Sequence, residues 1–203
     1  PETWGAPLRS FTPPAEDGWY PDVYVAKLDP SGHLLWNTFL GGSGYDYGGG
    51  LAFDNDGHIV ICAESDRTWG DPNQPFSGDR DIWLAALDRD GNLLWNTFLG
   101  GSGRDYQGTL LAARDGGFYV VGDSDGAWGC EESNCTRRPL SVGIYANQDA
   151  FVAKVDAHGR LIWNSFLGGS KRDYQGGISV DEESGHILVT GTNRIASHRN
   201  ISH

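Results

Sequence analysis

The chain has 203 residues, with 27 acidic and 15 basic side chains, which gives a formal net charge of −12 at pH 7. This length suits one domain or a row of small repeated units, and it can bury a core without help from metals or disulfides. Because binding to phosphate backbones depends on Lys and Arg, the acidic charge excludes nucleic acid as a general partner. No apolar run approaches the roughly 18 residues that span a bilayer, so membrane insertion is not expected.

The composition favours strands and tight turns. Glycine supplies 30 residues and aromatic side chains 12%, without the glycine period of collagen. No stretch keeps the i, i+3, i+4, i+7 apolar pattern of an amphipathic helix for three turns. The sequence therefore predicts an all-β protein. It begins at Pro1 without a recognisable signal peptide, which predicts a processed product or an excerpt of a longer polypeptide.

Three segments of 26 residues repeat in register along the chain. Residues 22–47 read DVYVAKLDPSGHLLWNTFLGGSGYDY, residues 81–106 read DIWLAALDRDGNLLWNTFLGGSGRDY, and residues 149–174 read DAFVAKVDAHGRLIWNSFLGGSKRDY. Fourteen positions are identical in all three copies without a gap, and the starts lie 59 and 68 residues apart. Repetition on this scale indicates a solenoid, a propeller or an array.

Each repeat, with the residues that follow it, predicts four short strands. In the first copy they run over residues 22–29, through Leu34, Trp36 and Phe39, over about 49–54 and over 58–64. The first strand is apolar on both faces, which is typical of a sheet covered on two sides. The turns at residues 29–32 and 54–57 have the Asp and Gly residues that tight turns favour.

Four antiparallel strands per repeat, apolar on both faces, indicate the blades of a β-propeller. The residues resemble the SBBP-type bacterial β-propeller repeat, whose hallmark is a D-a-F-V-A-K-L-D strand, a D-x-x-G turn and then L-x-W-x-x-x-L-G-G-s-x-x-D. The resemblance covers about residues 22–193, and Ala86 and Lys171 depart from the pattern. It implies a secreted or cell-surface scaffold without a shared catalytic activity.

This interpretation divides the chain into three blades and their connectors. Thr3-Trp4-Gly5 repeats the Trp-Gly signature that follows the fourth strands, so the first connector is expected to leave a preceding blade. Three blades are fewer than the roughly four that begin to close a propeller, which predicts further blades of the same polypeptide or an assembly. The expected order is a connector (1–21), blade one (22–65), a connector (66–80), blade two (81–124), a connector (125–148), blade three (149–192) and a C-terminal tail (193–203).

Aspartates recur at fixed places in the repeats. Paired carboxylates can catalyse glycoside hydrolysis, but a catalytic pair is needed only once, so hydrogen bonding to turn amides is the favoured interpretation. The glycine-rich segments lack the Lys-Ser/Thr of a phosphate-binding loop, so no nucleotide is expected. The two recurring sets are Asp22, Asp81 and Asp149 at the blade starts, and Asp46, Asp105 and Asp173 after the glycines.

Three D-x-D-G sequences are weak candidates for calcium binding. Each offers two carboxylates, whereas Ca²⁺ takes about six to eight oxygen ligands, so a plain turn is favoured and Ca²⁺ stays open. No other cofactor is expected. The candidate ligands are Asp54 and Asp56, Asp88 and Asp90, and Asp123 and Asp125.

The cysteines and tryptophans divide between core and connectors. In an oxidising compartment Cys130 and Cys135 are expected to form a disulfide, with two free thiols as the alternative, and Cys62 is expected to be buried. The repeated Trp36, Trp95 and Trp163 are expected in the core between blades. Possible ligand or partner contacts are the connector residues Trp4, Trp69 and Trp128, with anchoring of the loops to the blades as the alternative.

The favoured function is a non-enzymatic extracellular or cell-surface β-propeller with structural, adhesive or assembly roles. Its partners would be proteins or further blades. The alternative is a carbohydrate- or ligand-binding propeller that uses the connector aromatics. A third hypothesis is a hydrolase with its site in the connectors, although no acid, base or nucleophile constellation can be named. Its candidate carboxylates are Asp71, Asp79, Glu131 and Glu132.

Overall fold

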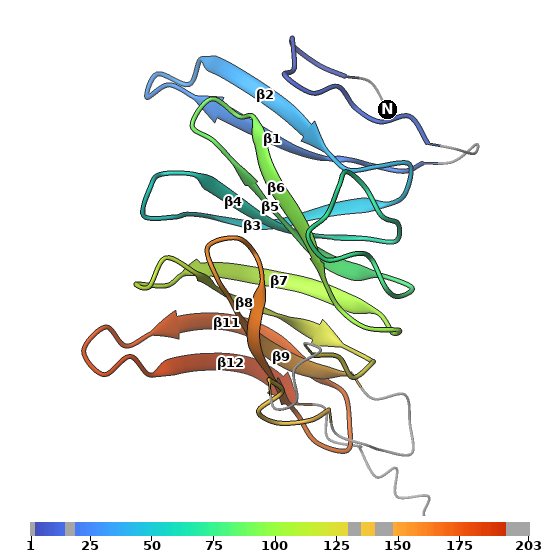
Figure 1. Ribbon diagram of the computed structural model, residues 1–203, viewed down its shortest axis with the longest axis vertical. Helices are drawn as coiled ribbons and strands as arrows, with labels where there is room; N and C mark the ends of the chain where they lie inside the picture. The colour runs from blue at the N-terminus through green and yellow to red at the C-terminus, as the bar shows by residue number, and fades with distance from the viewer. Residues whose placement is uncertain (1–2, 15–18, 130–134, 141–147, 194–203) are drawn as a thin grey trace, which may run out of the picture.

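The computed structural model describes residues 3–14, 19–129, 135–140 and 148–193 (Figure 1). Within these residues every regular element is a strand, so the all-β prediction is confirmed. The described part of the chain has no helix that is long and apolar enough to cross a bilayer. The strands are β1 (Val23–Leu28), β2 (Leu34–Leu40), β3 (Asp46–Phe53), β4 (Ile59–Ser65), β5 (Asp81–Leu87), β6 (Leu93–Leu99), β7 (Asp105–Ala112), β8 (Phe118–Ser124), β9 (Asp149–Val155), β10 (Leu161–Leu167), β11 (Asp173–Val180) and β12 (Ile187–Asn193).

The strands form four antiparallel sheets that follow one another along the long axis of the molecule (Figure 1). Two four-stranded sheets lie in the centre, with the orders β3-β4-β5-β6 and β10-β9-β8-β7. A two-stranded sheet lies at each end, β1-β2 beside the first central sheet and β11-β12 beside the second. Strand β7 also contacts both β3 and β11, so the third strands of the three repeats adjoin one another.

The sheets do not coincide with the repeated units of the sequence. Each central sheet joins the last two strands of one repeat to the first two strands of the next. The expected blades at 22–65, 81–124 and 149–192 are therefore wrong as hydrogen-bonded units. The glycine-rich segment after β2 leads the chain away to the next sheet, and the connector at 66–80 returns β5 to the edge of β4.

The pairing between repeats is the most regular in the molecule. Strands β4 and β5 form seven consecutive pairs from Ile59↔Leu87 to Ser65↔Asp81 without a register shift. Strands β8 and β9 repeat this pairing from Phe118↔Val155 to Ser124↔Asp149. The hairpins within repeats, such as β1–β2 and β5–β6, each contain a register shift. The two junctions between repeats, β4–β5 and β8–β9, therefore pair in the same register.

The central sheet β3–β6 has a core on each face, as the two-sided apolar pattern of its strands predicts. One face carries Ile61, Trp83 and Ala85 and packs against Val23 and Val25 of β1. The other face carries Cys62 and Leu84 and packs against residues of the β7–β10 sheet. All seven residues of β4, and all seven of β5, are buried.

The connectors cover the outer strands β2, β6 and β10. Asn37, Asn96 and Asn164 lie at the same place in these strands, and each donates its side-chain amide to the carbonyl of a connector tryptophan, at 2.9, 2.9 and 2.7 Å. The acceptors are Trp4, Trp69 and Trp128. The expectation that Thr3-Trp4-Gly5 repeats the other Trp-Gly signatures is therefore confirmed in the local structure.

Candidate metal-binding turn and paired carboxylates

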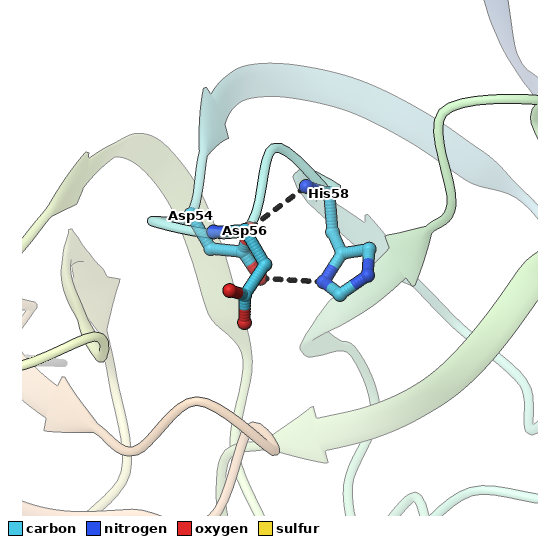
Figure 2. Close-up of side chains that lie close together, drawn as sticks. All are labelled: Asp54, Asp56 and His58. Atoms are coloured by element: carbon cyan, nitrogen blue, oxygen red, sulfur yellow. Dashed lines mark hydrogen bonds and ion pairs between the residues drawn. The ribbon is translucent and has the colours of Figure 1, made fainter.

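The β3–β4 turn brings together three side chains that could hold a metal ion (Figure 2). Asp54, Asp56 and His58 each place one ligand atom within 4.8 Å of the others. Only two of the three belong to the D-x-D-G pattern. Sequence reasoning missed His58, although its position directly after the turn glycine was visible.

The carboxylate of Asp54 is already used within this turn. Its Oδ1 accepts the amide protons of Asp56 at 2.9 Å and of His58 at 2.7 Å, and its Oδ2 lies 2.7 Å from His58 Nδ1. These contacts with His58 lower the pKa of Asp54, although partial burial opposes them. A metal ion would have to break the contact between Asp54 Oδ2 and His58 Nδ1 before it could bind both side chains. The geometry is therefore that of a turn whose polar groups hydrogen-bond to one another.

The other calcium candidates show the same use of carboxylates. Asp88 Oδ1 accepts the amide protons of Asp90 and Asn92, each at 2.9 Å, while Asp88 Oδ2 accepts the Asn92 side chain at 2.8 Å. Asp123 and Asp125 bond to different parts of the chain, because Asp123 accepts from Gln175 N in β11 and Asp125 accepts from Arg104 N just before β7. Among the described residues, neither of these two pairs belongs to a cluster of three or more possible metal ligands.

Two aspartates converge on a glycine in every repeat, and all six except the half-buried Asp22 are buried. A Cβ atom placed on Gly100 would lie 2.6 Å from Asp81 Oδ1 and 2.6 Å from Asp105 Oδ2. At Gly41 the corresponding distances are 2.9 Å to Asp22 Oδ1 and 2.5 Å to Asp46 Oδ2. In the third repeat Asp149 and Asp173 crowd Gly168 in the same way. Any larger residue would collide with the paired carboxylates, so glycine is required there.

The aspartates hold the backbone around this glycine. Asp46, Asp105 and Asp173 accept the amide of the following glycine at 2.9, 3.0 and 2.8 Å. Asp22 and Asp81 accept connector amides, from Thr12 and Ser77, each at 2.7 Å. The predicted bonding to turn amides is thus confirmed for Asp46, Asp105 and Asp173, whereas Asp22 and Asp81 bond to connector amides instead. In the first two repeats the paired carboxylates therefore join a connector to the turn.

Burial raises the pKa of the paired carboxylates in the first two repeats. Burial raises the pKa of Asp105 to about 7, and the neighbouring Asp81 adds to the rise. The pKa of Asp46 is also raised to about 7, first by burial and further by Asp22, whose own pKa burial raises to about 6. Within the described residues, Asp81 Oδ1 accepts no hydrogen bond. A proton on one member of a pair relieves the repulsion that two adjacent charges would produce.

The connector tryptophans do not form a common exposed surface. Trp69 and Trp128 are buried, and they pack edge-on against Trp83 and Phe151 with ring centroids 4.8 and 4.9 Å apart. Their predicted role in surface contacts is therefore wrong, because they fill the space between connector and sheet. Trp4 is 41% exposed, and Trp19, which sequence reasoning passed over, is 70% exposed.

Other predicted residues fall in several settings. Trp36, Trp95 and Trp163 are half-buried, and Trp36 and Trp95 pack against the cores. Cys62 is a buried free thiol, as predicted, and burial raises its pKa to about 12. Cys135 is in a disulfide, while Cys130 lies outside the described residues.

Two of the connector carboxylates proposed for a hydrolase, Asp71 and Asp79, lie within the described residues. Asp71 is exposed, and Asp79 is an exposed partner of Arg104 at 3.6 Å. Glu131 and Glu132 lie outside the described residues.

Comparisons with known proteins add no family to this description. No protein-family model matches the chain, and no curated protein matches it either. The resemblance to SBBP-type repeats therefore depends on the repeated residues themselves.

Proposed function

We propose that the chain is a non-enzymatic, extracellular or cell-surface scaffold of propeller-like blades, with structural, adhesive or assembly roles. The observation that carries this proposal is that the recurring polar residues make hydrogen bonds within the fold. Asp29, Asp88 and Asp156 accept amides of their own turns, while the asparagines of β2, β6 and β10 hold the connectors. The residues that repeat most faithfully thus have repeated structural contacts.

The arrangement of the sheets supports the propeller as the architecture of this scaffold. The inner strands of successive blades adjoin around a propeller axis, and β7 contacts both β3 and β11 in this way. A blade in this proposal consists of two strands from one repeat and two from the next. The two end sheets would then be half-blades.

A carbohydrate-binding role is a second candidate because the most exposed tryptophan of the described residues lies in a connector. Trp19 is 70% exposed, and aromatic rings on a surface can stack on sugar rings. The buried Trp69 and Trp128 give this candidate no support.

A glycan array probed with the purified chain separates the two functions. The scaffold proposal expects no saturable binding to any glycan. Saturable binding that is lost in Trp19→Ala and kept in the control Leu8→Ala, whose side chain is 52% exposed, would replace it with the second candidate.

A further inference from the structure

The two end sheets expose edge strands that are equivalent to buried strands elsewhere. Strand β1 corresponds to β5 and β9 in the repeat, and β12 corresponds to β4 and β8. In the described chain β1 pairs only with β2, and β12 pairs only with β11. Each edge therefore lacks the neighbour that its equivalents have, and an unpaired edge strand is a template for another strand.

A leucine on each of these edge strands is exposed, although its equivalents contact a neighbouring strand. Leu28 of β1 is 55% exposed, whereas the equivalent Leu87 and Val155 are 0% exposed. Leu188 of β12 is 57% exposed, whereas the equivalent Val60 is 1% exposed and the equivalent Tyr119 is half-buried. Both leucines are therefore more exposed than their equivalents at the junctions within the chain.

We propose that β12 of one copy pairs antiparallel with β1 of a second copy, in the register of β4–β5 and β8–β9. This inference deepens the proposed scaffold role, on which it rests, by naming the partner. Transferring the observed register gives the pairs Ile187↔Leu28, Leu188↔Lys27, Val189↔Ala26, Thr190↔Val25, Gly191↔Tyr24, Thr192↔Val23 and Asn193↔Asp22.

The sizes of the side chains fit this register. Each junction within the chain places an aromatic residue opposite a small one, Trp83 opposite Ala63 and Phe151 opposite Gly122. A Cβ atom on Gly122 would lie only 2.8 Å from the Phe151 ring, so the aromatic ring uses the space that the small residue leaves. The proposed register places Tyr24 opposite Gly191, which reproduces this combination.

The charges fit as well. At the β8–β9 junction Lys154 reaches from β9 to Asp115 in the β7–β8 turn, with its Nζ 2.6 Å from Oδ1. Lys27 is the equivalent of Lys154, and the β11–β12 turn carries Asp181, Glu182 and Glu183. In the proposed pairing the lysine of one copy therefore approaches the acidic turn of the other.

A second copy is the natural occupant because this chain carries both halves of the junction. The two edges differ from each other, so the contact is heterologous and each copy keeps one free β1 or β12 until a ring closes. Of the other edge strands, β2, β6 and β10 are covered by connectors, while β3, β7 and β11 adjoin one another. This leaves β1 and β12 as the edges for this pairing.

The experiment measures association by light scattering after size-exclusion chromatography, with three leucines that are similarly exposed in the isolated chain. Leu28→Asp blocks the β1 edge, and Leu188→Lys blocks the β12 edge by opposing Lys27. Leu35, on β2, is 56% exposed, and its equivalents Leu94 and Ile162 are exposed too, so the same charges at Leu35 are matched controls. A cooperative thermal melt shows that each variant is folded.

The wild type and both Leu35 variants are expected to elute at multiples of the 22.0 kDa chain mass, and each edge variant alone at the monomer mass. Mixing the two edge variants should restore a dimer, because one retains β1 and the other retains β12. A monomeric wild type, equal loss in the Leu35 controls, or a mixture that stays monomeric would overturn the pairing. None of these results would alter the glycan-array test, so the scaffold role would then need another partner.

Discussion

Strands β5 and β1 occupy the same place in the repeat, yet they lie in different surroundings. Every residue of β5 is buried between β4 and β6 and under a core on each face. In β1 only Val23 and Val25 are buried, while Tyr24, Lys27 and Leu28 are exposed. The two strands have the same apolar pattern, so the difference comes from their neighbours. An apolar pattern on both faces suits a strand that is covered by neighbouring sheets on both sides. Whether such a strand is actually buried depends on whether those neighbours are present.

The largest expected effect contrasts the aromatic residues of these two strands. Trp83→Ala in β5 should lower the free energy of unfolding by about 3–5 kcal/mol, because it leaves a cavity in the core between the β3–β6 sheet and β1. Tyr24→Ala in β1 should cost much less, since the Tyr24 side chain is 61% exposed whereas Trp83 is fully buried. Denaturant unfolding of the monomeric chain measures both. Equal losses would mean that the Tyr24 side chain is buried within the single chain, contrary to its 61% exposure.

A second prediction uses the buried carboxylate pair of the central sheets. Asp105 has a folded pKa of about 7, above the roughly 3.9 of an unfolded aspartate. Between about pH 4 and 7 the folded protein therefore holds a proton that the unfolded chain has released. The stabilisation is fully present at the acidic end of this window and is lost as the pH rises through the folded pKa. Unfolding free energies at pH 5 should exceed those at pH 8.

Asp105→Asn tests the source of this slope. The substitution removes the titrating group and should reduce the fall between pH 5 and 8 by about 2–3 kcal/mol. Asp88→Asn is the control, because hydrogen bonds from Asn92 and the turn amides lower the pKa of Asp88, so its contribution is lost only below the unfolded value. An unchanged slope in Asp105→Asn would contradict the assignment.

Thiol labelling sharpens the comparison between β4 and β12. Cys62 of β4 is fully buried, and Thr190 is its exposed equivalent in β12. The cysteine of Thr190→Cys should react with iodoacetamide more than about tenfold faster than native Cys62, because both exposure and thiolate formation limit the reaction. Peptide mass spectrometry of the labelled protein gives both rates. Rapid labelling of Cys62 would show that β4 opens readily.

The smallest expected effect concerns metal ions. Asp54 and Asp88 already accept hydrogen bonds within their turns. EDTA should therefore change the melting temperature by less than about 1–2 °C, which corresponds to well under about 1 kcal/mol of unfolding free energy. A large fall that added Ca²⁺ reverses would show that an ion holds these turns.

Much of the local structure could be predicted from the sequence. Expected bounds such as 58–64 lie within one residue of β4, because alternating apolar residues and Asp-Gly turns are local signals. The expected third strand begins at Gly49, whereas β3 begins at Asp46, because the buried Asp46 joins the ladder by pairing with Ser65.

The grouping of strands could not be predicted in the same way. A repeat in the sequence has no marked beginning, so a unit that starts at Asp22 fits the pattern as well as one that starts at Asp46. Pairing between β4 and β5 depends on contacts across a 15-residue connector, which leave no periodic signal. The tryptophans show the same limit, because Trp69 and Trp4 share a sequence signature but differ in exposure.

The offset between repeat and sheet has a consequence for a nicked chain. The connector at residues 66–80 joins two strands, β4 and β5, that are already paired at seven positions. A protease that cuts in this connector would break the covalent chain and leave the sheet closed across the break. The N-terminal fragment, which ends with β4, and the C-terminal fragment, which begins with β5, should therefore migrate as one particle under native conditions. They should separate only in denaturant.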